Sequence, residues 1–193
     1  MHDDAPADDH VVDIAPRLDA ADLGLLVLRL AVGLTFAAHG AQKAFGWWAG
    51  PGWIGWQKVV GRMGFRPPEL FAAISIAAEL VGGLLLACGI LTPLAAAILL
   101  AQSVVIVVKV HAPSGFWAKE GGFEYPLALG VGAVAVGLIG PGVMSVDGLV
   151  ELTVPDAVRV VLVIAGLLAG TIALALPTAT RSSDTKGPAA SAR

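Results

Sequence analysis

The stretch LRLAVGLTFAAHGAQKAFG, residues 28–46, decides the fold class, because it is apolar enough to cross a bilayer and yet carries Arg29, His39, Gln42 and Lys43. A charge near the centre of a spanning helix costs about 2.5–3.5 kcal/mol on insertion scales, whereas each Leu or Val returns only about 0.3–0.6 kcal/mol. Charged residues at such depth normally face the protein interior and pair with another group. The stretch therefore predicts a membrane helix that lies inside a bundle.

The composition of the whole chain is that of an integral membrane protein. Of its 193 residues, 56% are hydrophobic and 14% are charged, and the mean hydropathy is +0.80. A spanning helix needs about 20 predominantly apolar residues, and five segments approach this length: 23–45, 70–91, 94–110, 125–139 and 157–176. The sequence predicts an all-α integral membrane protein, with a four-helix transmembrane bundle and an additional C-terminal fifth transmembrane helix.

Both ends of the chain are predicted to be disordered tails. Residues 1–22 hold seven aspartates and one arginine, unlike the basic start of a signal peptide, and residues 178–193 are rich in small and polar side chains. Between them we expect a membrane domain over 23–148 and the extra helix within 149–177. The chain has a net charge of −3 and no basic patch with interleaved aromatic residues, so nucleic-acid binding is not expected.

A short amphipathic segment separates the first two apolar runs. Trp53, Trp56, Val60 and Met63 share one face of a helical projection, and four of the five tryptophans lie within residues 47–56. Tryptophan prefers the membrane interface, so we predict a short helix in the headgroup plane. The functional alternative is an aromatic lid over a binding site.

The polar residues of the first helix fall on one face. Arg29, Gly33, Phe36, Gly40 and Lys43 follow a helical repeat, with His39 at the edge of the same face. This pattern predicts a polar intramembrane seam, and the glycines allow another helix to approach closely. The simpler alternative is that the long cations reach the membrane interface along the helix.

The second helix supplies the counter-ion for this seam. Glu79 is the only acidic residue well inside an apolar segment, and it precedes Gly82 and Gly83. We therefore predict a membrane-embedded ion pair between Glu79 and either Arg29 or Lys43.

Further polar residues follow in the second half of the chain. Gln102 and Lys109 lie seven residues apart on the third helix, and His111 ends its apolar run; the last two can also act only as interface anchors. After the fourth helix, Ser145 or Asp147 can cap the segment that follows.

These residues, in this order, resemble the DoxX family of small bacterial membrane proteins. The resemblance rests on LRLAVGLTFAAHGAQKAFG, on a GF dipeptide before a proline turn, on ELVGGLLLACGILTPLA (79–95), on the histidine after the third helix and on GPGVMSVD (140–147). It covers about residues 23–148 and implies a four-helix membrane bundle in the bacterial cytoplasmic membrane. It also implies a link to quinone reduction, respiratory electron transfer or redox-stress assemblies. Many relatives have a basic residue where this chain has Pro93, and many stop soon after the GPG segment.

The resemblance can be carried onto particular positions of this chain. The matching positions are Arg29, His39, Gly40, Lys43, Glu79, Gly82, Gly83, His111, Ser145 and Asp147, of which His39, Lys43 and Glu79 are the candidate catalytic residues. Gln42, Gln102 and Lys109 join the candidates only because they are polar residues within apolar helices. The matching positions suggest a quinone-binding subunit that works with a partner oxidoreductase. The alternatives are a small-solute transporter and a non-catalytic scaffold or assembly factor. Four histidines and one cysteine give no convincing haem or metal set, so electrons are expected to come from a partner or a soluble reductant.

Two further expectations concern assembly and orientation. GLLAG, residues 166–170, is a GxxxG pattern that permits either homo-oligomer formation through Gly166 and Gly170 or packing within the bundle. With five spans, two cations lie on the side of the N-terminus and nine on the other side. The positive-inside rule then predicts an external N-terminus and a cytoplasmic C-terminus.

Overall fold

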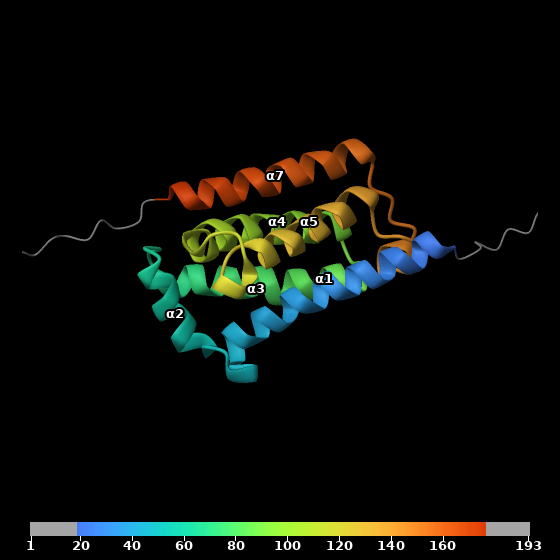
Figure 1. Cartoon of the computed structure of the whole chain (residues 1–193). Helices are drawn as coiled ribbons and strands as arrows, with labels where there is room; N and C mark the ends of the chain where they lie inside the picture. Colours follow the sequence, from blue (N-terminus) through green and yellow to red (C-terminus); the bar gives the residue numbers. More distant parts are fainter. Residues whose placement is uncertain (1–18, 177–193) are drawn as a thin grey trace, which may run out of the picture.

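The computed structural model describes residues 19–176, and these form helices and connecting turns without any strand. Figure 1 shows the long helices running side by side, with a shorter helix, α2, lying across one end. The helices are α1 (Ala20–Phe45), α2 (Gly52–Arg62), α3 (Pro68–Cys88), α4 (Thr92–Ile106), α5 (Glu124–Ile139), α6 (Val146–Leu149) and α7 (Asp156–Ala175). A π-helix, Val107–His111, continues α4. The all-helical fold class is confirmed.

Four helical segments are long and apolar enough to cross a membrane. They are Ala20–Phe45, Pro68–Cys88, Thr92–Ser114 and Asp156–Ala175. Helix α5 is apolar but has only 16 residues, which is short of the usual length for a span. The C-terminal helix α7 thus meets the criteria for a span, while five crossings in total stay a prediction.

The first helix begins earlier than the sequence predicted. Asp19 is its N-cap and accepts a hydrogen bond from the backbone N–H of Asp22, whose side chain accepts one in return from the Asp19 N–H. This capping box places residues 20–22 in α1, although they were assigned to the acidic tail. The remainder of that tail, residues 1–18, and the C-terminal tail at 178–193 lie outside the described residues.

Glycines bring α1 and α3 into backbone contact. A Cβ atom at Gly33 would lie 2.6 Å from the Gly83 carbonyl oxygen, and one at Gly83 would lie 2.6 Å from the Ala37 nitrogen. Further along, a Cβ atom at Gly40 would lie 2.7 Å from the Cα atom of Leu80. The predicted close approach of a helix to this face of α1 is therefore correct, and it fixes which residues of α3 lie opposite each residue of α1.

The two glycines of the GxxxG pattern in α7 pack against another helix of the same chain. A Cβ atom at Gly166 would lie 3.0 Å from the Cα atom of Ala97, and one at Gly170 would lie 2.7 Å from the Ala101 carbonyl oxygen. Helix α4 covers both glycines, as the alternative of packing within the bundle predicted. Gly166 and Gly170 therefore offer no free surface for the predicted homo-oligomer contact. The opposite side of α7 exposes large apolar side chains such as Val161 and Ile172, as expected for contact with lipid.

Helix α2 closes one end of the bundle. Val60 is buried there with Phe65 and Ala72, and Trp56 and Met63 pack against this cluster. Trp47, Trp48 and Trp53 remain exposed. The amphipathic helix is thus present, and its position in the headgroup plane stays a prediction.

Candidate functional site

The predicted polar seam is divided into two separate clusters. Arg29 and Lys43 lie 14 residues apart on α1, which corresponds to about 21 Å along a helix. Between them, Phe36 is buried and Gly33 and Gly40 lie against the backbone of α3. The five residues share the buried face of α1, as predicted, but the polar groups do not form a continuous line.

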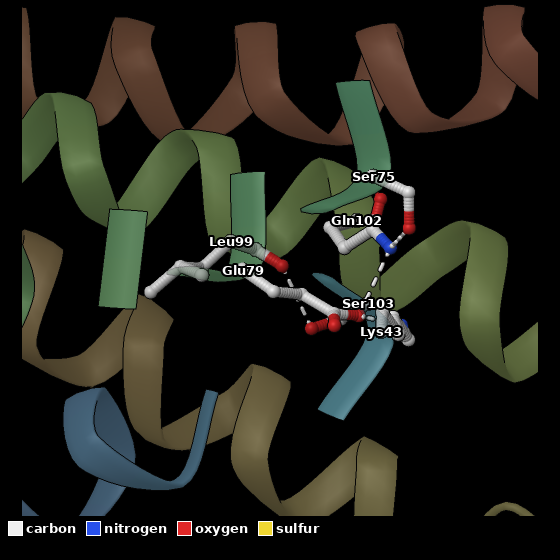
Figure 2. A network of polar contacts seen from close by, with 6 residues as sticks. All are labelled: Lys43, Ser75, Glu79, Leu99, Gln102 and Ser103. Atoms are coloured by element: carbon white, nitrogen blue, oxygen red, sulfur yellow. Dashed lines mark hydrogen bonds and ion pairs between the residues drawn. The ribbon is translucent and has the colours of Figure 1, made fainter. Parts of the chain in front are cut away.

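Glu79 forms its ion pair with Lys43 and not with Arg29, the other candidate partner from the sequence. The Lys43 Nζ atom contacts Glu79 Oε1, and Figure 2 shows both side chains together with Gln102 and Ser75. Gln102 Nε2 donates to Glu79 Oε1 at 3.0 Å and to Ser75 Oγ at 2.8 Å. Glu79 is fully buried. We call Lys43, Glu79, Gln102 and Ser75 the polar centre.

The polar centre leaves one carboxylate oxygen without a partner. Lys43 and Gln102 both act on Oε1, whereas Glu79 Oε2 is buried and has no hydrogen-bond donor among residues 19–176. Buried polar atoms in native proteins nearly always have a partner from protein, water or ligand. The unpartnered oxygen therefore marks a place where a hydrogen-bond donor is missing.

A cavity of about 220 Å³ lies beside the polar centre. Polar and aromatic side chains from five helical segments line it: His39 and Lys43 of α1, Trp56 of α2, Glu79 of α3, His111 of the π-helix and Tyr125 of α5. The rings of His39 and Tyr125 meet edge to face, with centroids 6.2 Å apart. The candidate catalytic residues His39, Lys43 and Glu79 thus share one cavity, the remainder of whose wall is apolar.

The π-helix at the end of α4 helps to form this cavity. The wider turn places both Val110 and His111 on the cavity wall. The Nδ1 atom of His111 lies 2.7 Å from the Gly121 carbonyl oxygen, so that nitrogen donates and the ring is tied to the loop before α5. Single π-turns of this kind are frequent at functional sites.

Trp56 joins the polar centre to the end-closing helix α2. Its ring centroid lies 4.3 Å from Lys43 Nζ, in a cation–π contact. It lines the first cavity and also a second one of about 230 Å³, whose wall includes Ser75 and Gln102. Its indole N–H is buried and has no acceptor among residues 19–176. One of the four clustered tryptophans thus lines the site, while its action as an aromatic lid stays a prediction.

The second cluster surrounds Arg29 at the opposite end of α1. Arg29 is 1% exposed and donates to the Met144 carbonyl oxygen. The buried carboxylate of Asp147 attracts its charge and accepts from the backbone N–H groups of Leu91 and Thr92, each at 2.8 Å. Arg29 therefore lies deep in the protein, as predicted, but does not pair with Glu79.

The cluster around Arg29 is architectural. Asp147 caps the start of α4, a different helix from the one predicted, while Ser145 accepts from the Gly148 N–H and caps α6. Leu91 needs this support because its φ of 46° is in the left-handed region and its own segment offers no side-chain cap.

The remaining candidates do not reach the polar centre. Gln42 packs against the turn at Gly50: a Cβ atom added to Gly50 would lie 2.7 Å from the Cβ atom of Gln42. Lys109 lies 5.8 Å from the ring centroid of Phe65. Gly82 contacts α4, and Gly40 and Gly83 serve the contact between α1 and α3. Sequence reasoning missed Ser75 and Tyr125, since a single Ser or Tyr in an apolar run gives no signal of its own.

Comparison with protein families agrees with the resemblance seen in the sequence. Residues 24–112 match the model of the DoxX family, a range that covers most of α1 and all of α2, α3 and α4 and includes Lys43, Glu79, Gln102 and His111. No curated protein and no solved structure is similar enough to match the chain. The expected continuation of the domain to residue 148 lies beyond the matched region. Residues 24–112 of the chain therefore form a DoxX-family domain.

Proposed function

We propose that this membrane protein binds a quinone in the cavity beside the polar centre and acts as the membrane subunit of a quinone-linked redox system. The observation that carries the proposal is the grouping of His39, Lys43, Glu79 and Trp56 around one largely apolar cavity inside a membrane bundle. Small-molecule sites typically combine an apolar wall with a few convergent polar groups.

The residues present fit a quinone ring. The cavity of about 220 Å³ exceeds the ~150 Å³ of an apolar cavity known to hold benzene. Trp56 Nε1 lacks an acceptor, which a carbonyl oxygen of the ring can supply, and Glu79 Oε2 lacks a donor, which a hydroxyl group of the reduced ring can supply. When bound, a quinone supplies reversible two-electron, two-proton chemistry.

The side chains of the cavity suit that chemistry. Lys43 provides a fixed positive charge that stabilises negative charge developing on a ring oxygen. His39 lines the same cavity, and an imidazole there can exchange a proton with the ligand. Glu79 holds Lys43 in position through their ion pair. A partner oxidoreductase or a soluble reductant is proposed as the electron source.

The transporter alternative receives less support from this arrangement. A carrier that used the seam as its pathway needs polar groups along the length of α1. Instead, the region between Arg29 and Lys43 is filled by Phe36 and by backbone contact between α1 and α3. The cluster at Arg29 holds helix ends together, which leaves the polar centre as the candidate site.

Purification tests the proposal directly. The full chain is extracted from its membrane in mild detergent, and quinone and co-purifying proteins are quantified by mass spectrometry. Val110 lines both cavities, so Val110→Trp fills the site, whereas Val108→Trp changes a neighbour that lines neither. We expect bound quinone with the wild type and with Val108→Trp, and at least several-fold less with Val110→Trp. Equal quinone in all three proteins would overturn the proposal.

A further inference from the structure

The hydrogen bonds of Glu79 are distributed unevenly between its two oxygens. Oε1 accepts from Lys43 and Gln102, while Oε2 is buried without a donor. A buried acceptor that is left unsatisfied costs free energy that a single donor recovers. The group that completes the site must therefore present a hydrogen-bond donor to Oε2.

The neighbouring side chains do not supply that donor. Gln102 directs its amide N–H groups to Ser75 and to Oε1 of Glu79. Lys43 contacts Oε1, and the Nδ1 atom of His111 is committed to the Gly121 carbonyl oxygen. A ligand in the adjoining cavity, which Trp56 also lines, can supply that donor in place of water.

We infer that the cavity selects the reduced form of its ligand, a hydroquinone, whose hydroxyl group donates to Glu79 Oε2. This inference rests on the proposed function. A hydroquinone hydroxyl both donates and accepts, so it satisfies Glu79 and Trp56 alike. The carbonyl oxygens of a quinone only accept, and one of them would face the lone pairs of the carboxylate oxygen. The site thus favours the hydroquinone, which carries the hydroxyl protons, over the quinone.

Equilibrium binding to the full chain in lipid nanodiscs tests the inference. The probes are a short-tailed benzoquinone, its hydroquinone under anaerobic reducing conditions, and the dimethyl ether of that hydroquinone, which lacks the donor. Because a hydrogen bond to a charged acceptor is strong, we expect the hydroquinone to bind at least about tenfold more tightly than either other probe.

A matched variant separates the hydrogen bond from the shape of the ligand. Glu79→Gln keeps the size of the side chain but places an amide, which can donate, at the same position. The preference for hydroquinone should fall to about equality or reverse toward the quinone. Equal binding of all three probes to the wild type would overturn this inference while leaving quinone binding intact. Binding of none of them would overturn the proposed function as well.

Discussion

At the scale of single residues, the ion pair between Lys43 and Glu79 is the feature on which the site depends. Both side chains lie inside the bundle, with 12% and 1% of their side-chain surface exposed. Such a pair contributes little net stability compared with a well-packed apolar pair, but removing one partner leaves the other charge buried alone. The pair is therefore better regarded as a fixed charge arrangement than as a source of stability.

Replacing Glu79 with Ala should lower the free energy of unfolding by about 3–5 kcal/mol, because Lys43 then lies in the bundle without its counter-ion. Adding Lys43→Ala should recover part of that loss, whereas adding Arg29→Ala should make the protein less stable still. Thermal unfolding in detergent of the two double variants measures this difference. Strictly additive losses for Glu79→Ala and Lys43→Ala would show that the two residues are not coupled.

The sequence could identify the charges of the site but not their partners. Glu79 was found because it is the only acidic residue deep in an apolar run, and Lys43 because it shares the buried face of α1. The choice between Arg29 and Lys43 depends on how α1 and α3 are aligned. Contact between Gly33 and Gly83 aligns them so that Arg29 lies beside Gly89, ten residues beyond Glu79.

At the scale of helices, neighbouring glycines of α3 have different roles. A Cβ atom at Gly83 would lie 2.6 Å from backbone atoms of α1, where neither helix can yield easily. A Cβ atom at Gly82 would lie 3.4 Å from a Leu99 side-chain atom, an ordinary contact. The contact between α1 and α3 that positions Lys43 against Glu79 therefore depends on one glycine of the pair.

The variant Gly83→Ala should separate α1 from α3 and lower stability by at least about 3 kcal/mol, the upper range for overpacking. Gly82→Ala should change stability by no more than about 1 kcal/mol, since alanine favours the helix and its Cβ atom has room. Melting temperatures and retention of quinone report the two effects. Similar losses in both variants would contradict the proposed division of roles.

Helix positions were largely readable from the sequence, while the interactions between helix ends were not. All five apolar runs became helices, because hydrophobic length is a strong local signal. The cap of α4 comes from Asp147, more than fifty residues away, and no local pattern indicates such a partner. The π-turn at Val107–His111 was also missed, although it shifts the side chains that line the cavity.

At the scale of the whole molecule, the arrangement predicts opposite locations for the two ends of the bundle. The loop before α5 lies at the end closed by α2, and the start of α7 lies at the other end (Figure 1). An external N-terminus places the start of α7 outside the cell and the loop before α5 in the cytoplasm. The polar centre then lies nearer the cytoplasmic surface.

Cysteine labelling in a Cys88→Ser background tests this orientation. Asp156 and Lys119 are exposed residues at the two ends, with 94% and 78% of their side-chain surface accessible. A maleimide that cannot cross membranes should label Asp156→Cys in intact cells and Lys119→Cys only in inverted vesicles. The reverse pattern would show that the N-terminus is cytoplasmic.

The claim that a quinone occupies the cavity beside the polar centre is tested most directly by photo-cross-linking. An azido-substituted short-tailed quinone is activated in native membranes that contain the protein, and the modified peptides are mapped by mass spectrometry. We predict adducts at cavity residues such as His39, Trp56 or Tyr125, and their loss when excess unmodified quinone competes. Adducts confined to exposed side chains such as Val131 or Val161, and unaffected by competition, would contradict the account.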